Sequence, residues 1–258
     1  MFSFLFFQYS ITFILSVIIA ILILSLGIIV FLNNRKKKVN KIFLLMDISI
    51  VFWIISVVAR FNFNNPALIL TGARLSYATA AIVCFLINYF CYYFPQKNNY
   101  KFPLFPGIFL TILIILLSYP DHYIIKDIIL VNGMQKNIFG PLFFIFALFF
   151  PLNVGWGIYN LLTKRGLLDR LGRAQINFIL SGVVFSTAIG FSTNLIIPFL
   201  FETSLTERYG PLSPFVFIVL TTYAIFKHQL FNVKIIATEL FSFALWIILL
   251  IKVFLSNS

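Results

Sequence analysis

Residues 4–32 read FLFFQYSITFILSVIIAILILSLGIIVFL, an apolar run without a charged side chain. The run exceeds the roughly 20 residues with which a helix crosses a hydrocarbon core of about 30 Å. It ends at residues 33–38, NNRKKK, a basic block of the kind that flanks a membrane segment. The run is too long for the apolar part of a cleaved signal peptide, so we interpret it as a transmembrane helix.

The rest of the chain repeats this pattern of apolar runs between short polar breaks. Of its 258 residues, 61% are hydrophobic and 10% are charged, whereas soluble domains are about half apolar and about a quarter charged. The sequence therefore predicts an all-α, polytopic membrane helix bundle. We expect seven transmembrane helices, at about residues 4–32, 42–58, 67–93, 104–118, 141–162, 175–200 and 211–226. An eighth apolar helix is expected at about residues 236–255, with Glu239 near its start.

The basic residues predict how the helices are oriented. A formal net charge of +12 would suggest a nucleic acid partner in a soluble protein, but in a membrane protein Lys and Arg gather on the cytoplasmic side. With the amino terminus outside, 13 of the 19 basic residues fall on the cytoplasmic side and 6 on the outer side. We therefore predict a multi-pass protein of the plasma membrane, with membrane lipids around it and no nucleic acid partner.

The connection between the fourth and fifth expected helices has a pattern of its own. Two extended runs, IIKDIILV (124–131) and MQKNIF (134–139), flank Asn132-Gly133. Asn-Gly between such runs favours a two-residue hairpin turn, because both turn positions need a positive φ. We expect a small β-hairpin on the outer face.

Several short motifs occur in a fixed order along the chain. The second half contains FGPL (139–142), RAQ (173–175) before SG (181–182), Asn194 with Pro198, YGPL (209–212) and YAIFKHQLF (223–231). The first half contains ARLSYA (73–78) and Phe94-Pro95. Over about residues 10–235 the chain resembles the N-terminal seven-helix membrane region of bacterial histidine kinases. The resemblance implies signal input, with an extracellular or intramembrane ligand that shifts helices toward a cytoplasmic output.

The resemblance does not extend to a kinase core. Family members continue into a phosphoacceptor histidine and an ATP-binding domain, but the histidines here are His122 and His228, and no glycine-rich ATP-lid sequence follows. Phosphate loops, metal-ligand spacings and nucleophile elbows are also lacking, so we predict no catalytic residue, no cofactor, no metal and no enzyme activity. We expect a sensor region at residues 1–232 and a C-terminal apolar helix at 233–258, truncated before a cytoplasmic kinase output domain. The chain is then a fragment of a longer kinase or a stand-alone sensor, and a homodimer is a further expectation.

Two polar positions point to the inner half of the membrane. Asp47 lies about 9 Å into the second helix, counted from Lys41 at about 1.5 Å per residue. A carboxylate there costs about 2.5–3.5 kcal/mol and usually faces a partner in the bundle. It is either a signal-relay or proton-sensitive site, or a structural contact or protonated acid near the headgroups. Asn88, like Asn160 and Asn177, lies near the cytoplasmic end of its expected helix. We expect these three side chains to form hydrogen bonds between helices.

Arg74 and Asn194 are the candidates for the outer half. Both lie at a similar depth, about 12 Å and about 9 Å along their helices from the outer boundary. We expect them to line an outward-facing pocket for a polar or anionic ligand. In the alternative, Arg74 extends to lipid phosphate or caps backbone carbonyls.

A transporter or channel subunit is the alternative from another functional class. Transporters show inverted repeats whose helices break near the middle of the membrane. Here the prolines and glycines gather at helix ends, and the two Gly-Pro-Leu motifs repeat in one orientation, which favours a sensor. A structural partner of another membrane protein fits the sequence as well as a sensor does.

Overall fold

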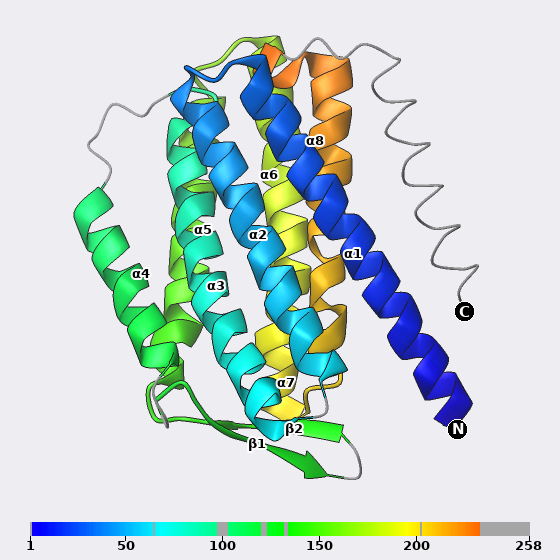
Figure 1. Ribbon diagram of the computed structural model, residues 1–258. Helices are drawn as coiled ribbons and strands as arrows, with labels where there is room; N and C mark the ends of the chain where they lie inside the picture. The colour runs from blue at the N-terminus through cyan, green and yellow to red at the C-terminus, as the bar shows by residue number, and fades with distance from the viewer. Residues whose placement is uncertain are drawn as a thin grey trace.

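The computed structural model describes residues 2–63, 65–96, 103–119, 123–131, 134–201 and 203–232. Its helices stand side by side in one bundle, with a two-stranded sheet across one end (Figure 1). The helices are α1 (Phe2–Asn33), α2 (Lys38–Asn62), α3 (Pro66–Tyr93), α4 (Leu104–Ser118), α5 (Phe143–Arg165), α6 (Arg170–Phe191), α7 (Ile197–Phe201) and α8 (Pro214–His228). The eighth expected apolar helix, with Glu239, lies outside the described residues.

Three short helical turns complete the bundle. A π-helical turn, η1 (Ser192–Ile196), joins α6 to α7, so that residues 170–201 continue as one helix. Two 3₁₀ turns, η2 (Glu207–Leu212) and η3 (Leu230–Asn232), lie before and after α8.

Six of the seven expected spans are long and apolar enough to cross a membrane. These are Ile11–Asn33, Lys38–Asn62, Pro66–Tyr93, Phe143–Arg165, Arg170–Phe201 and Glu207–His228. The remaining expected span, α4, has 15 residues. At about 1.5 Å per residue it is shorter than a hydrocarbon core of about 30 Å. It packs against α3 at the edge of the bundle (Figure 1). The expected seven full-length spans are therefore confirmed for six.

Two helices extend clearly beyond the apolar runs that predicted them. α2 covers Lys38–Asn62 where about 42–58 was expected, and α6 begins at Arg170, not near residue 175. At the start of α6 the Asp169 side chain accepts a hydrogen bond from the Gly172 N–H at 2.8 Å, which is an N-cap. Apolar runs show the part of a helix that lies in the membrane, whereas caps set its ends. As a result Arg60, which follows the expected span at about residues 42–58, lies in the last turn of α2.

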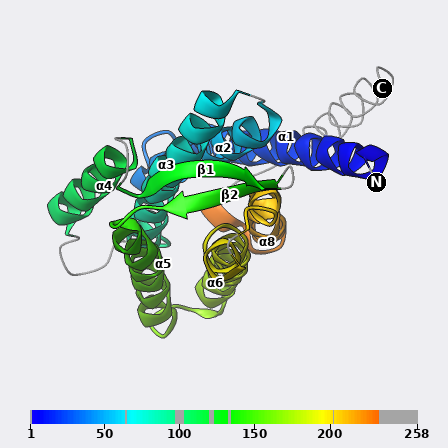
Figure 2. The same cartoon turned by 90° about the horizontal axis from the view of Figure 1, so that it is seen from below.

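The expected β-hairpin is confirmed. β1 (Ile125–Val131) pairs antiparallel with β2 (Met134–Phe139), and the register ends at Val131 opposite Met134. The turn residues, Asn132 and Gly133, lie outside the described residues. Seen from below, the two strands cross the end of the helix bundle (Figure 2). We call this end the hairpin end.

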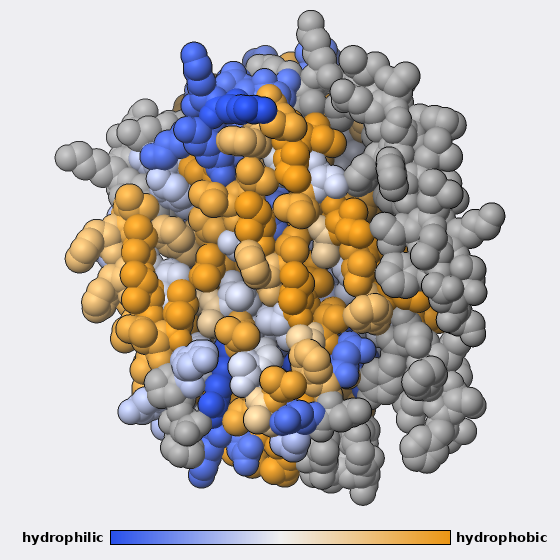
Figure 3. All heavy atoms as spheres, in the orientation of Figure 1, coloured by the Kyte–Doolittle hydropathy of each residue, from blue (hydrophilic) through white to orange (hydrophobic). Residues whose placement is uncertain are grey.

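The opposite end of the bundle carries the α1–α2 turn and the exit of α8 (Figure 1). Arg35, Lys36, Lys37, Lys38 and Lys41 lie in or next to that turn, and all five side chains are exposed. We call this end the basic end. Hydrophilic side chains gather at both ends of the visible face, and hydrophobic ones cover the middle, as a membrane protein requires (Figure 3).

Candidate functional site

A buried ion pair lies at the hairpin end. Arg60, at the end of α2, is 1% exposed, and its Nη1 donates to the Glu207 carboxylate of η2. Glu207 is 3% exposed. Two opposite charges withdrawn from water are stable only when hydrogen bonds satisfy their remaining donors and acceptors.

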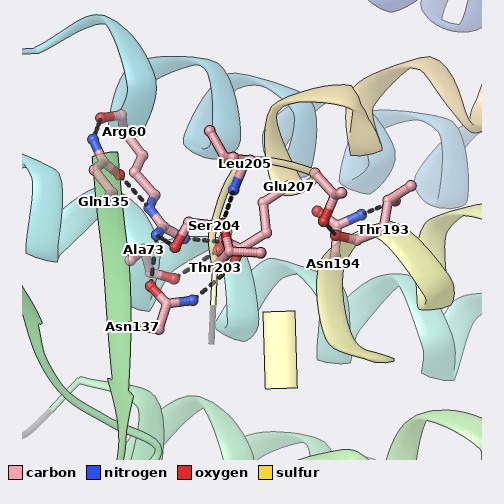
Figure 4. A network of polar contacts seen from close by, with 12 residues as sticks. Arg60, Ala73, Gln135, Asn137, Thr193, Asn194, Thr203, Ser204, Leu205 and Glu207 are labelled. Atoms are coloured by element: carbon pink, nitrogen blue, oxygen red, sulfur yellow. Dashed lines mark hydrogen bonds and ion pairs between the residues drawn. The ribbon is translucent and has the colours of Figure 1, made fainter. Parts of the chain in front are cut away.

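Three further side chains supply those hydrogen bonds (Figure 4). Arg60 donates through Nε to Gln135 Oε1 at 3.0 Å, and through Nη2 to Asn137 Oδ1 at 2.6 Å and Ser204 Oγ at 3.1 Å. Asn137 in turn donates through Nδ2 to Glu207 Oε1 at 2.6 Å. Because Gln135 and Asn137 belong to β2, this network attaches the hairpin to α2 and to the segment after α7.

The sequence contained one weak signal for this network. Arg60 and Glu207 are opposite charges that adjoin membrane segments at the same end. Nothing in the local pattern pairs two residues 147 positions apart.

A cavity of about 110 Å³ lies between the helices, with Glu207 at its polar end. Residues of α2, α3, α5, α6, η1, η2 and α8 line it, so helices from both halves of the chain meet there. Most of the lining side chains are apolar, among them Trp53, Phe146 and Phe217. Cavities of this size in protein interiors hold small ligands such as benzene.

Polar side chains also line this cavity, among them Tyr77 and Asn194. The hydroxyl of Tyr77 is buried and has no hydrogen-bond partner among the described residues. Asn194 donates through Nδ2 to the Gly190 carbonyl at 2.8 Å and to Thr193 Oγ1 at 2.9 Å, which leaves Oδ1 as the acceptor of its amide. Buried polar groups normally have a partner, so the Tyr77 hydroxyl points to a hydrogen-bonding ligand.

Asn194 is held in place by its surroundings. It lies in η1, and single π-helical turns inside α-helices are frequent at functional sites. A Cβ on Gly210, in η2, would overlap the Asn194 amide. The glycine of the Tyr-Gly-Pro-Leu motif therefore makes room for the Asn194 side chain beside the cavity.

The structure does not bring Arg74 to this cavity. Arg74 is half-buried on α3, and its Nη1 lies 3.5 Å from the Tyr119 carbonyl at the end of α4. Asn194 lines the cavity and Arg74 does not. The depth of a residue along a helix does not determine the side of the helix on which its side chain lies. The shared pocket expected for this pair is thus replaced by a cavity that Asn194 lines without Arg74.

Asp47 lies between α1 and α2. Its side chain is 0% exposed, and neither carboxylate oxygen has a hydrogen-bond partner in the described part of the chain. A Cβ placed on Gly27 of α1 would lie 2.7 Å from Asp47 Oδ2, so the carboxylate packs directly against the α1 backbone. The neighbouring Met46 lines the cavity, whereas Asp47 does not.

Asn88 takes part in hydrogen bonds between α3 and α5. Its Nδ2 donates to Asn153 Oδ1 at 3.4 Å, and its Oδ1 accepts from Asn160 Nδ2 at 3.5 Å. Interhelical bonds were expected for Asn88 and Asn160, and both have them. No cluster of three or more His, Cys, Asp or Glu that could hold a metal occurs among the described residues.

The exit of α8 is anchored at the basic end. Gln229 ends the helix with a left-handed backbone, at φ 50°. The Phe231 ring lies 5.0 Å from the Phe43 ring, and its carbonyl accepts from Asn33 Nδ2 at 3.1 Å. Phe43 also contacts Phe217, a cavity residue, with ring centroids 6.1 Å apart. A continuous line of rings therefore runs from the cavity to the exit.

A family model described as the N-terminal 7TM region of histidine kinase matches residues 12–234. No curated protein matches the chain. The matched range contains all the residues that line the cavity and the whole exit segment through Asn232.

Proposed function

Because this chain belongs to the family of N-terminal 7TM regions of histidine kinases, we propose that it binds a small neutral amphipathic ligand in the central cavity and transmits the binding to the exit of α8. The chain is a helical membrane sensor region, and its 258 residues are too few to include a kinase core besides the matched range. Family membership favours the sensor over the transporter or channel alternative. The partner that receives the signal is a histidine kinase output domain.

The cavity carries this proposal. Its apolar walls suit an apolar ligand body, and Tyr77 and Asn194 supply a donor and an acceptor for one polar group. Ligand sites generally combine a mostly apolar lining with a few polar groups that fix orientation. The Arg60–Glu207 pair neutralises the charge at the polar end, so a neutral head group fits better than an ion.

The ring contacts from Phe217 through Phe43 to Phe231 supply the route for transmission. Contact alone does not prove that ligand binding is coupled to the exit of α8. Coupling requires an element with two arrangements, one of which is stabilised more than the other by the ligand. We assign that role to the exit segment, because Gln229 and Phe231 both have positive φ angles that a small helix shift can change. Asp47, between α1 and the cavity-lining α2, and Asn88, between α3 and α5, are proposed relay positions.

The orientation is part of the same proposal. We place the hairpin end outside and the basic end in the cytoplasm, because Lys and Arg in short loops stay on the cytoplasmic side. The cavity then receives an extracellular or intramembrane ligand, and the exit of α8 meets the output domain. Arg74 lies at the outer level but outside the cavity, so we assign it no contact with this ligand.

Ligand binding can be tested with 4-fluorobenzyl alcohol, which has one ring and one hydroxyl. The full chain in lipid nanodiscs should give a saturable ¹⁹F resonance that empty nanodiscs lack. Ala80→Phe fills the cavity from α3 and should abolish this resonance, whereas Ala67→Phe, at an exposed position of the same helix, should retain it. An unchanged resonance in Ala80→Phe, or none in the wild type, would refute the cavity as the site.

Transmission needs a separate readout. With Cys84 and Cys91 replaced by alanine, Leu230→Cys places a thiol at a fully buried exit position. Binding of 4-fluorobenzyl alcohol should change the rate at which a water-soluble maleimide modifies this thiol. This change in rate should disappear in Ala80→Phe. Equal rates with and without 4-fluorobenzyl alcohol would show that binding in the cavity is not transmitted to the exit of α8.

A further inference from the structure

A second cavity, of about 320 Å³, opens at the basic end. The first turn of α2 forms one side of it, residues 93–96 form another, and Gln175 and Phe231 complete it. It lies at the opposite end of the bundle from the hairpin, and its lining is more polar. In the part of the chain that the structure describes, no acidic side chain lines it.

The first turn of α2 offers free backbone donors to this cavity. Lys37 is the N-cap residue, and its side chain makes no capping hydrogen bond. The Asn34 side chain accepts instead from the N–H groups of Lys36 and Lys37, which precede the helix. The first N–H groups of a helix have no partner inside it, so those of residues 38–40 remain available. Such an end binds phosphate groups well.

Two lysine side chains add positive charge at the same place. Lys37 and Lys38 line the cavity and are exposed. Lys38 Nζ donates to the Tyr93 hydroxyl at 2.7 Å and lies 4.4 Å from the centre of that ring. The side chains of Tyr93 and Tyr89 thereby use two of its three N–H donors, and the ammonium is held at the cavity with one donor left.

Asn40 supplies an independent sign of a ligand. This cavity residue is 0% exposed, and its Nδ2 donates to the carbonyls of Val30 at 2.8 Å and Asn34 at 3.3 Å. Those two acceptors fix the orientation of the amide. Its Oδ1 then has no donor among the described residues. A bare phosphate would leave that oxygen without a partner, whereas a neighbouring hydroxyl would satisfy it.

We propose that this cavity binds the headgroup of an anionic phospholipid that carries both a phosphate and a hydroxyl, such as phosphatidylglycerol. The phosphate meets the α2 N-terminus and the two lysines, and a headgroup hydroxyl donates to Asn40 Oδ1. Val39, Phe94 and Phe231 supply apolar contacts for the rest of the lipid. The position at the end of a membrane bundle favours a lipid over a free phosphate ester, because basic pockets between helices bind anionic headgroups.

The site also has a consequence for the exit of α8. Phe231 belongs to both the cavity lining and the exit segment. A bound headgroup stabilises the exit in the observed arrangement, so the lipid composition of the inner leaflet becomes a second input. This inference does not depend on what binds in the central cavity.

Native mass spectrometry of the full chain, released from nanodiscs of mixed lipids, tests the proposal. The wild type should retain one phosphatidylglycerol in preference to phosphatidylethanolamine. Lys37→Gln and Lys38→Gln should each weaken retention about fivefold, the effect of one basic contact at a membrane surface. Lys36→Gln is the matched control, with the same charge change in the same turn but outside the cavity lining, and should change retention less than twofold.

Three outcomes would overturn the assignment. Equal losses in Lys36→Gln, Lys37→Gln and Lys38→Gln would show a diffuse basic surface and no site. Displacement of the lipid by equimolar glycerol 3-phosphate would identify a site for soluble phosphate esters. Equal retention of phosphatidylmethanol, an anionic phosphodiester whose headgroup has no hydroxyl, would refute the role given to Asn40.

Discussion

The guanidinium of Arg60 and the carboxylate of Glu207 form a buried ion pair across 147 residues of chain. The pair connects the end of α2 to η2, and Asn137 of β2 bonds to both partners. Glu207 also lines the central cavity. The hairpin, two membrane helices and the candidate ligand site therefore share one polar network.

Removing one partner of this network should be costly. Arg60→Ala leaves the Glu207 carboxylate buried and unpaired, which we expect to lower the free energy of unfolding by about 3–5 kcal/mol. Unfolding in mixed micelles with rising SDS measures the loss. Lys126→Ala, which removes an exposed charge from β1, is the control and should cost less than about 0.5 kcal/mol.

A double substitution measures how much the contact between Arg60 and Glu207 contributes to stability, apart from the other effects of each single substitution. Arg60→Met with Glu207→Met removes both charges, so it should cost less than the sum of the two single substitutions. Strict additivity would mean that the pair contributes no mutual stabilisation.

The Tyr-Gly-Pro-Leu motif at residues 209–212 makes a sharper local prediction. Gly210→Ala places a methyl group on the Asn194 amide and should force that side chain to move, at a cost of about 1–3 kcal/mol. The fluorinated probe should also bind more weakly. Gly155→Ala is the matched control, because nothing lies within 4 Å of a Cβ there and alanine favours a helix. Equal stability of the two variants would contradict the close packing at Gly210.

The membrane fold followed from the sequence because hydrophobic run length and turn chemistry are local properties. The run at 4–32 predicted α1, and Asn132-Gly133 predicted the pairing of Val131 with Met134. Asn88 could be assigned an interhelical bond, since an amide in the bilayer needs a partner wherever the helices pack. α4 shows the limit, because its apolar composition suggested a span that its length does not support.

The site was harder to predict for two reasons. It depends on which side of each helix faces the cavity, and on contacts between residues far apart in the sequence. Asn194 was selected from its depth along the helix, and it lines the central cavity. The same reasoning selected Arg74, which lies against the end of α4 instead. Arg60 and Glu207 were missed, since each resembles an ordinary loop charge until the fold brings them together. Asp47 stays a candidate relay residue, and neither of its carboxylate oxygens has a hydrogen-bond partner in the described chain.

Lys164 provides a prediction at the basic end. Its Nζ donates to the carbonyls of Cys91, Tyr92 and Phe94 at 2.8, 2.6 and 2.7 Å, and so caps the end of α3. Lys164→Met should lower the free energy of unfolding by about 3 kcal/mol, because bonds to charged groups contribute about 1.5–3 kcal/mol each and water replaces some of them. Arg165→Met, at the exposed neighbouring position, should have little effect. Similar losses in both variants would show that the cap is not stabilising.

The proposed orientation gives the last prediction. With Cys84 and Cys91 replaced by alanine, Asn65→Cys and Lys37→Cys each place one thiol at an exposed position, at the hairpin end and the basic end respectively. If the basic end is cytoplasmic, a membrane-impermeant maleimide should modify position 65 in intact cells and spare position 37. Position 37 should react once the membrane is permeabilised, which shows that its thiol is accessible. Labelling of position 37 but not of position 65 in intact cells would reverse the orientation and place the lipid site of the basic end in the outer leaflet.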